Sequence, residues 1–405
     1  MTGRRILFVH DNFPGQFGAL AIYLRDRGWE VAFACKPTQR SLPGVRILPY
    51  APHRAPRPET HPYAQAMDRA AITAQAFVRA ALAARAQGYR PDLVVAHSGW
   101  GAGMFARDVF PEAGFIAYCE WWYRHPGADM AFLAALEARA PRTSVEAAIL
   151  ERARNAPIAL DLASADAALC PTGFQARQFP EHLRRGLTLG HDGVDTEALR
   201  PAPPGFDRTL GGLVAEDAPV VTYATRGMEP HRGFPQFMAA LPQVLAENPK
   251  AIVLIAGENR VAYGGDAIRR VDWKAQALAE HGFDPARVRF LGRLETARYV
   301  ALLQRSDAHV YLTVPFVLSW SMLEAMSAGA PMVLSDTEPV REFADASEAW
   351  LVDFTAASIA AGVSAALADR DGRRRSAARD RVLAAAAQSR TLPAREALFL
   401  SRLPA

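Results

Sequence analysis

Two arginines of this chain are spaced to bind a phosphate group. Arg226 and Arg232 lie six residues apart in a segment that follows the apolar run 219–224, and a glycine comes directly after each. A guanidinium group binds a phosphate group through two parallel hydrogen bonds. Parallel sheets bind their ligands at the loops that follow the strands. We therefore predict a diphosphate site here, with a pair of solvated surface arginines as the alternative.

A short helical pattern near residue 320 supplies further polar groups. Ser319 opens the pattern 319–328, Trp320 follows it, and Glu324 comes later on the same helix. A serine at a helix start caps it and leaves backbone amides free for an anion, and a carboxylate accepts hydrogen bonds from vicinal hydroxyls such as those of ribose. The segment predicts nucleotide contacts, although a buried helix with one exposed glutamate would have the same pattern.

The first half of the chain carries a histidine and an aromatic run. His97 follows the apolar run 92–96, and Glu120 precedes Trp121 and Trp122. A histidine at a strand end is a candidate general base, while aromatic faces beside a carboxylate suit a sugar. We take His97 and Glu120 as candidate catalytic residues. A satisfied turn histidine and a packed aromatic cluster are the alternatives.

The first apolar run, 5–9, leads into a loop that contains Gly15, Gln16 and Gly18. Glycines between a strand and a helix let backbone amides approach a phosphate, so Gly15 and Gln16 join the predicted diphosphate contacts, with a tight turn as the alternative. The dinucleotide fingerprint GxGxxG is absent, and Cys35 and Lys36 stand where an acid would follow the second strand. A nicotinamide-dependent oxidoreductase is therefore disfavoured.

Alternating strands and helices must position these loops. Short apolar runs alternate with helical patterns in two series, which is typical of parallel sheets with crossover helices. The runs are 5–9, 30–34, 45–48, 92–96, 114–118 and 166–169, then 219–224, 251–256, 287–291, 308–312 and 331–334. A segment rich in proline and glycine, 201–212, separates the series. We predict an α/β protein of two Rossmann-like doubly wound domains, 1–198 and 199–385, with a C-terminal helix over about 386–405 packed back on the first.

Composition and charge exclude several classes of protein. The 405 residues are 50% hydrophobic and 22% charged, the balance of a globular protein. The net charge of +4 lies entirely in residues 1–200, and no basic run is long enough for a nucleic-acid arm. Three cysteines show no disulfide or zinc spacing, and no apolar run reaches the ~18 residues of a membrane span. We expect a cytoplasmic protein without a nucleic-acid partner, and leave open a peripheral contact of the first domain with the inner face of the membrane.

In this order, the motifs resemble the retaining glycosyltransferases of family 4, which have the GT-B fold. The resemblance is strongest over residues 187–345 and rests on four segments. These are His191–Asp195 with Pro201, where Asp192 replaces the usual asparagine; Arg226 with Arg232-Gly233; Phe290–Arg293; and Leu323–Met326 with Gly329 and Pro331.

The resemblance implies two domains that face each other across a cleft, and a role for each matched residue. Gly292 and Arg293 would read the nucleobase, and Glu324 would bind the ribose. One departure concerns the transferred sugar, because the family has a second glutamate eight residues before this one and Phe316 stands there. The predicted diphosphate contacts are Arg226, Arg232, Gly15, Gln16, Ser319 and Trp320, and the predicted contacts of the sugar or the acceptor are Phe316, Val317, Leu318, Trp121 and Trp122.

The function implied by the resemblance is transfer of a sugar from a nucleotide-sugar donor to an acceptor, with retention of configuration. The acceptor would be a glycan, a lipid-linked molecule or another compound, and we expect no cofactor and no metal ion. Three explanations of Phe316 remain open: Ser319, Ser321 or Glu120 replaces the missing glutamate, the donor sugar is unusual, or catalysis has been lost. The alternative function is non-catalytic binding of nucleotide sugars or glycans on the same fold.

Overall fold

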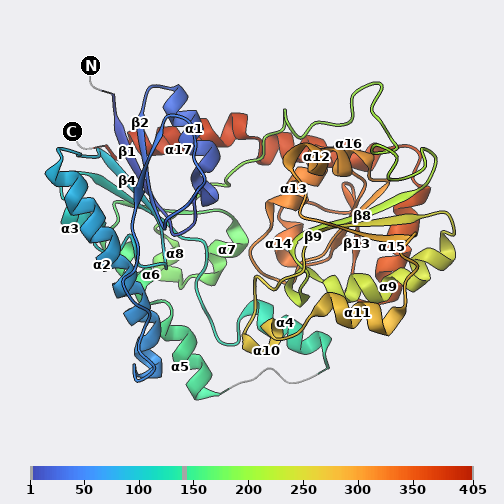
Figure 1. The fold of residues 1–405 in the computed structure, drawn as a ribbon, viewed down its shortest axis with the longest axis horizontal. Coiled ribbons are helices and arrows are strands. Elements are labelled where there is room, and N and C mark those ends of the chain that lie inside the picture. The colour runs from blue at the N-terminus through green and yellow to red at the C-terminus, as the bar shows by residue number, and fades with distance from the viewer. Residues whose placement is uncertain (1–2, 139–143, 404–405) are drawn as a thin grey trace. The chain divides into compact units, whose positions relative to one another are not determined.

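The chain divides into two units, and a computed structural model describes its residues 3–138 and 144–403 (Figure 1). The first unit comprises the chain up to Gly127, the stretch that ends at Asp192, and the C-terminal segment from Ser389. The second unit runs from Gly193 to Gln388 and also contains the segment that starts at Ala128. In this last respect the units differ from the division predicted at residue 198, which left that segment in the first domain.

The first sheet has the order β3-β2-β1-β4-β5-β6-β7, and all of its neighbouring strands are parallel. Its central strands are apolar throughout because both faces of the sheet are buried. In β1, for example, every side chain from Ile6 to Val9 is at most 1% exposed. The strands are β1 (Arg5–Val9), β2 (Glu30–Cys35), β3 (Val45–Pro49), β4 (Leu93–His97), β5 (Gly114–Tyr118), β6 (Ala167–Cys170) and β7 (Leu187–Leu189).

Helices from both ends of the chain surround this sheet. The C-terminal helix, red in Figure 1, lies beside α1, and its residues Leu392 and Phe399 belong to the same core as Leu20 of α1. The helices are α1 (Gly18–Asp26), α2 (Gln65–Ala86), α3 (Ala106–Val109), α5 (Val145–Ala153), α6 (Ala156–Ser164), α7 (Gly173–Gln178), α8 (Glu181–Arg184) and α17 (Gln388–Leu400). None of the helices in the described part of the chain is both long and apolar enough to cross a bilayer.

The second sheet has the order β10-β9-β8-β11-β12-β13 and is parallel as well. Its strands are β8 (Val220–Gly227), β9 (Ile252–Glu258), β10 (Val288–Gly292), β11 (Ala308–Tyr311), β12 (Met332–Ser335) and β13 (Ala349–Val352). Its helices are α9 (Phe234–Glu247), α10 (Asp266–Arg269), α11 (Trp273–His281), α12 (Thr296–Arg305), α13 (Trp320–Ser327), α14 (Glu338–Arg341), α15 (Ala356–Ala368) and α16 (Arg373–Ala385).

Helix α4 (Ala128–Leu136) packs on the second unit, although its residues lie between β5 and β6 of the first sheet in the sequence. Leu133 is buried in the core of the second unit. The ring of Phe132 packs against the ring of Phe354, with 5.1 Å between the centroids. These apolar contacts hold α4 in the second unit.

Both sheets reverse their order beside their first strand, between β1 and β4 and between β8 and β11. In doubly wound sheets the ligand lies outside the carboxyl ends of the strands at this reversal. Gln16 follows β1 and His97 is the last residue of β4, while Arg226 lies near the end of β8 and Ser319 follows β11. The predicted pair of Rossmann-like parallel sheets is confirmed, and it places the chemically active loops at the two reversals.

Candidate functional site

The second unit has a pocket of about 250 Å³ at the carboxyl ends of β8 and β9. Gly257 forms part of its wall and has φ +139°, and a Cβ there would lie 2.1 Å from the carbonyl oxygen of Thr225. Glycine is therefore required for β9 to pass so close to β8. The pocket is lined by Ala224, Thr225, Arg226, Ala256, Gly257, Arg293, Leu294, Tyr299, Ser319, Trp320, Ser321 and Glu324.

One end of the pocket is suited to an anion. Arg226 is exposed and lines the pocket, as do Ser319 and Ser321 at the start of α13. Ser319 caps α13: its Oγ accepts a 3.4 Å hydrogen bond from the amide of Ser321, and its own amide donates to the hydroxyl of Tyr311 at 2.9 Å. The positive end of the α13 helix dipole and a guanidinium group both favour negative charge.

Arg232, the other predicted phosphate ligand, is only 6% exposed and does not line this pocket. Its Nη1 donates to Thr313 Oγ1 at 2.8 Å, to the carbonyl oxygen of Val317 at 3.1 Å and to Tyr311 OH at 3.3 Å. Its guanidinium also lies 5.2 Å from the ring centroid of Tyr263. The structure thus brings Arg226 to the pocket, whereas Arg232 braces the loop that precedes α13.

Glu324 faces the pocket from α13 and is held by a residue of the neighbouring helix. The hydroxyl of Tyr299, on α12, donates to Glu324 Oε2 at 2.7 Å, and both residues line the pocket. Burial raises the pKa of the Glu324 carboxyl, and the hydrogen bond from Tyr299 opposes that rise. No sequence motif singles out Tyr299, because it lies on a helix among apolar residues.

The remaining residues predicted for the second unit lie partly outside the pocket. Arg293 lines it, while Gly292, just before, adopts a left-handed conformation with φ +66°. Phe316, Val317 and Leu318 do not line it. The ring of Phe316 instead contacts the rings of His231 and Tyr263, at 5.6 and 5.0 Å between centroids.

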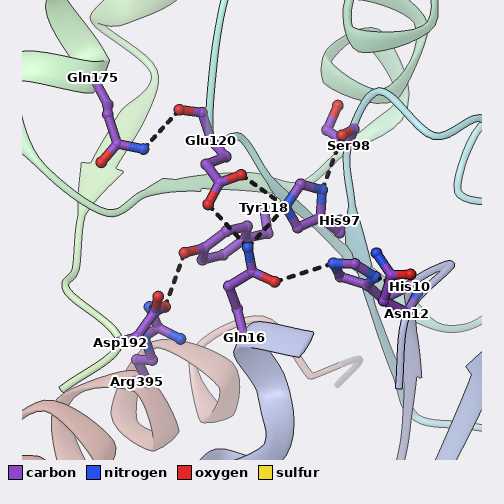
Figure 2. Close-up of polar contacts among 10 residues, drawn as sticks. All are labelled: His10, Asn12, Gln16, His97, Ser98, Tyr118, Glu120, Gln175, Asp192 and Arg395. Carbon is purple, nitrogen blue, oxygen red and sulfur yellow. Dashed lines mark hydrogen bonds and ion pairs between the residues drawn. The ribbon is translucent and has the colours of Figure 1, made fainter. Parts of the chain in front are cut away.

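In the first unit, the loops after β1, β4 and β5 bring four polar side chains together (Figure 2). Gln16 lies between the others: its Oε1 is 3.0 Å from His10 Nε2, and its Nε2 is 2.9 Å from Glu120 Oε1 and 3.4 Å from His97 Nε2. Glu120 Oε2 lies 3.5 Å from His97 Nε2. The predicted residues Gln16, His97 and Glu120 therefore form one network.

His10, which the sequence did not mark as a site residue, fixes the orientation of this network. The amide of Asn12 donates to His10 Nδ1 at 2.8 Å, so a neutral ring carries its proton on Nε2 and donates to Gln16 Oε1. The amide nitrogen of Gln16 must then point toward Glu120 and His97. Burial lowers the pKa of His10 well below its usual value and the nearby His97 lowers it further, while the hydrogen bond to Gln16 opposes this.

A buried aspartate on α6 supports the loop of His97. His97 Nδ1 lies 3.0 Å from the carbonyl oxygen of Ser98, and Ser98 Oγ donates to Asp161 Oδ2 at 2.7 Å. The amide of Gly99 donates to the same oxygen at 3.3 Å. Burial raises the pKa of Asp161 to about 6 despite these hydrogen bonds. Asp161 precedes the strand β6 by several residues, so its sequence position gives no sign of this role.

The other residues predicted for the first unit have packing roles. Trp121 and Trp122 lie within 6.1 and 5.5 Å, centroid to centroid, of Phe174 and Phe179. Gly15 has φ +49°, and a Cβ there would lie 3.0 Å from the ring of His10. The backbone of Gly15 thus lies close to the ring of His10.

The segment that contains Asp192 is anchored in the first unit by a buried ion pair. Arg395 of α17 donates to Asp192 Oδ1 at 2.6 Å and to the carbonyl oxygen of Gly190 at 2.8 Å. The hydroxyl of Tyr118, at the end of β5, donates to the same carboxylate oxygen at 2.8 Å. These contacts fix the chain just before it enters the second unit at Gly193.

Comparison with known families and proteins gives consistent matches. Residues 27–199 match the family described as "Glycosyl transferase family 4 group", and residues 212–382 match "Glycosyl transferases group 1". A phosphatidyl-myo-inositol mannosyltransferase of Mycolicibacterium smegmatis is 30% identical over 181 residues, which is 44% of this chain and 40% of that protein.

Solved structures share the fold over nearly the whole chain. Sucrose-phosphate synthase from Thermosynechococcus elongatus superimposes with a TM-score of 0.73 at 17% identity, covering 98% of each chain. HepE of Anabaena, solved in complex with UDP and glucose, gives a TM-score of 0.69 at 15% identity, covering 98% of this chain and 99% of that one. The two matched families and the shared GT-B fold lead to one assignment: the chain belongs to the family-4 glycosyltransferases.

Proposed function

We propose that this protein transfers a sugar from a nucleotide-sugar donor to an acceptor hydroxyl, with retention of configuration. The observation that carries the proposal is the pocket of the second unit, where Arg226, the start of α13 and the Glu324 carboxylate line one cavity. An arginine together with the positive end of a helix dipole suits a diphosphate, and a carboxylate suits the two hydroxyls of a ribose. A nucleoside diphosphate presents both groups.

Arg226 and the amides near Ser319 would act when the bond between the sugar and the diphosphate breaks. Negative charge then grows on the departing diphosphate, and fixed positive groups stabilise it more strongly than they stabilise the intact donor. Glu324, held by Tyr299, would orient the nucleotide through its ribose. Ionised Glu324 is the form that accepts both ribose hydrogen bonds.

In the first unit we assign recognition of the sugar or the acceptor to the network around Gln16. His97 and Glu120 are the candidates that accept the proton of the acceptor hydroxyl as its oxygen bonds to the sugar. Gly15 and Gln16 are proposed to contact the diphosphate through their backbone amides. The structures of HepE in complex with UDP and with UDP-glucose support a nucleotide-sugar donor on this fold.

The diphosphate assignment is tested by Arg226→Ala, with Arg370→Ala at an exposed position after α15 as the matched control. Isothermal titration with UDP, GDP and ADP should show binding of at least one, and Arg226→Ala should weaken that binding about tenfold or more, since a charged hydrogen bond contributes ~1.5–3 kcal/mol. Equal affinities of Arg226→Ala and the control would refute the assignment. The anomeric configuration of a transfer product, read by NMR, tests retention.

A second candidate function is binding of a nucleotide sugar without transfer. The observation in its favour is Phe316, which stands where a carboxylate is expected and packs against His231 and Tyr263. Purified protein incubated with a nucleotide sugar and an acceptor panel separates the two functions. Release of the nucleoside diphosphate favours the transferase, while tight binding without release favours the binding protein.

A further inference from the structure

Five residues of the second unit form a cluster beside Phe316, which we call the α4 cluster: Asp129, Glu229, His231, Tyr263 and Phe316. Asp129 comes from α4, and the others come from the loops after β8, β9 and β11. All lie in the second unit. The cluster is not part of the pocket lining, but it is built from the same loops.

One of the two carboxylate oxygens of Asp129 has no hydrogen-bond partner among the described residues. Its Oδ2 lies 3.2 Å from His231 Nε2, and Oδ1 has no hydrogen bond to any residue in 3–138 or 144–403. The Asp129 side chain is 15% exposed, whereas that of His231 is 1% exposed. With its proton on Nε2, neutral His231 donates to Asp129 and fixes the direction in which the free oxygen points.

Two further acceptors of the cluster are buried and unpaired among the described residues. One is His231 Nδ1 and the other is Glu229 Oε1. Glu229 Oε2, in contrast, accepts hydrogen bonds from the amides of Ala262 and Tyr263. A buried polar atom without a partner costs roughly 1–3 kcal/mol, so such atoms in one place indicate a partner that the chain does not supply.

The unpaired acceptors lie next to aromatic surfaces. Phe316 meets Tyr263 at an interplanar angle of 64° and His231 at 76°, both edge-on. Hydrogen-bond acceptors beside apolar ring surfaces match a sugar, which offers several hydroxyl donors and apolar C–H faces. A phosphate does not fit, because it has no donors for these acceptors and two carboxylates would repel it.

The cluster is close in sequence to residues that line the pocket. Glu229 and His231 follow Arg226, which lies near the end of β8, and Phe316 precedes Ser319 in the loop after β11. The two loops are joined, since the amide of Val314 donates to the carbonyl oxygen of His231 at 3.1 Å. The group that lies next beyond a diphosphate in a nucleotide sugar is the sugar itself.

We propose that Asp129, positioned by His231, binds a hydroxyl of the donor sugar and so selects which sugar the protein accepts. The proposal rests on the proposed function. The substrate class is a neutral, hydroxyl-rich sugar. The choice of donor sugar is thus set by Asp129, whose position in the sequence lies between β5 and β6.

The test compares the affinity for a nucleotide sugar with that for the matching diphosphate. Titration calorimetry of the full chain uses UDP and UDP-glucose and also GDP and GDP-mannose, and the tighter pair is carried forward. Asp129→Asn keeps an oxygen for His231 but turns the free acceptor into a donor. It should lower the affinity for the nucleotide sugar about tenfold and leave that for the diphosphate unchanged within about twofold.

Asp108→Asn, at an exposed position of α3, is the matched control, and Asp129→Ser is the second variant if Asp129→Asn does not fold by circular dichroism. A change that is equal for both ligands, or no change for either, overturns the role of Asp129 while leaving the nucleotide site intact. No binding of any nucleotide to the wild-type chain overturns the proposed function, and the role of Asp129 falls with it.

Discussion

At the scale of single residues, the hydrogen bond from Tyr299 affects the protonation of the Glu324 carboxyl in the pocket. Ionised Glu324 accepts hydrogen bonds from both ribose hydroxyls, protonation removes part of this acceptor capacity, and burial raises the pKa of the carboxyl. The affinity for a nucleotide should therefore fall as the pH is lowered toward that pKa. The Tyr299 hydroxyl opposes the rise, since it donates to Oε2 at 2.7 Å.

Tyr299→Phe should move this loss of affinity to higher pH and weaken binding about tenfold at neutral pH, because a hydrogen bond to a carboxylate contributes ~1.5–3 kcal/mol. Calorimetric titrations with the tightest-binding nucleotide over a series of pH values measure both effects. Tyr89→Phe is a matched control, because the Tyr89 hydroxyl is buried in the first unit without a hydrogen-bond partner among the described residues. An unchanged pH profile for Tyr299→Phe would contradict the prediction.

Asp161 makes a separate prediction about stability. Its pKa of about 6 in the folded protein lies above the ordinary 3.8, so the folded state holds the proton more tightly than the unfolded state does. The contribution of Asp161 to the free energy of unfolding is largest at low pH and is lost as the pH rises through about 6. Asp161→Asn removes this dependence.

We compare the free energy of unfolding of Asp161→Asn with that of wild type. The difference, variant minus wild type, should be higher at about pH 7.5 than at about pH 4 by ~1–3 kcal/mol. Urea unfolding followed by circular dichroism at both pH values gives the comparison. A difference of equal size at the two pH values would show that Asp161 does not titrate in this range.

At the scale of elements, α17 is tied to the first unit by buried charges as well as by apolar packing. Arg395 is 3% exposed and Asp192 is 7% exposed, and they form an ion pair at 2.6 Å. Removal of one member of such a pair leaves the other charge buried, which costs about 3–5 kcal/mol, whereas replacement of both costs far less. The pair therefore makes the position of α17 sensitive to a single change.

Arg395→Met should lower the free energy of unfolding by about 3 kcal/mol or more, and the double variant Arg395→Met with Asp192→Asn should recover most of that loss. Arg390→Met, at an exposed position of the same helix, is the control for the loss of a charge from α17. Denaturant unfolding measures these variants together with the single variant Asp192→Asn. If the double variant lost as much as the sum of Arg395→Met and Asp192→Asn, the two residues would be independent.

At the scale of the whole molecule, the proposed function assigns parts of a donor site to both units. Hydrogen exchange should then slow in four segments when a nucleotide sugar is added: 13–18 in the first unit, and 224–226, 256–257 and 319–324 in the second. Mass spectrometry of the peptides reads each segment separately. Protection restricted to the second unit would remove Gly15 and Gln16 from the diphosphate site.

Most strands of the two sheets were predictable from the sequence, because buried parallel strands consist of short apolar runs. Observed strands agree with the predicted runs within a few residues, for instance β1 at Arg5–Val9. The strands not predicted, β7 and β13, are the outermost strands of their sheets and only three and four residues long. Short edge strands depend on pairing with a neighbour more than on their own pattern.

The site was predictable where its residues follow strands and not where they lie on helices. Arg226 and His97 lie at the carboxyl ends of strands and Ser319 follows one, and topology alone brings these positions to the ligand-binding edge. Tyr299 and Asp161 reach their partners from helices, and their roles depend on packing between elements that no local pattern specifies. The burial of Arg232 likewise depends on the loop that folds over it.

The position of α4 in the sequence has a consequence for the design of chimaeras with altered sugar specificity. The second unit contains α4, whose residues lie between strands of the first sheet in the sequence. A chimaera joined at residue 193 would combine the pocket of one parent with the Asp129 position of the other. If Asp129 selects the sugar, the nucleotide preference of such a chimaera follows the parent of the C-terminal part, and its sugar preference follows the parent of the N-terminal part.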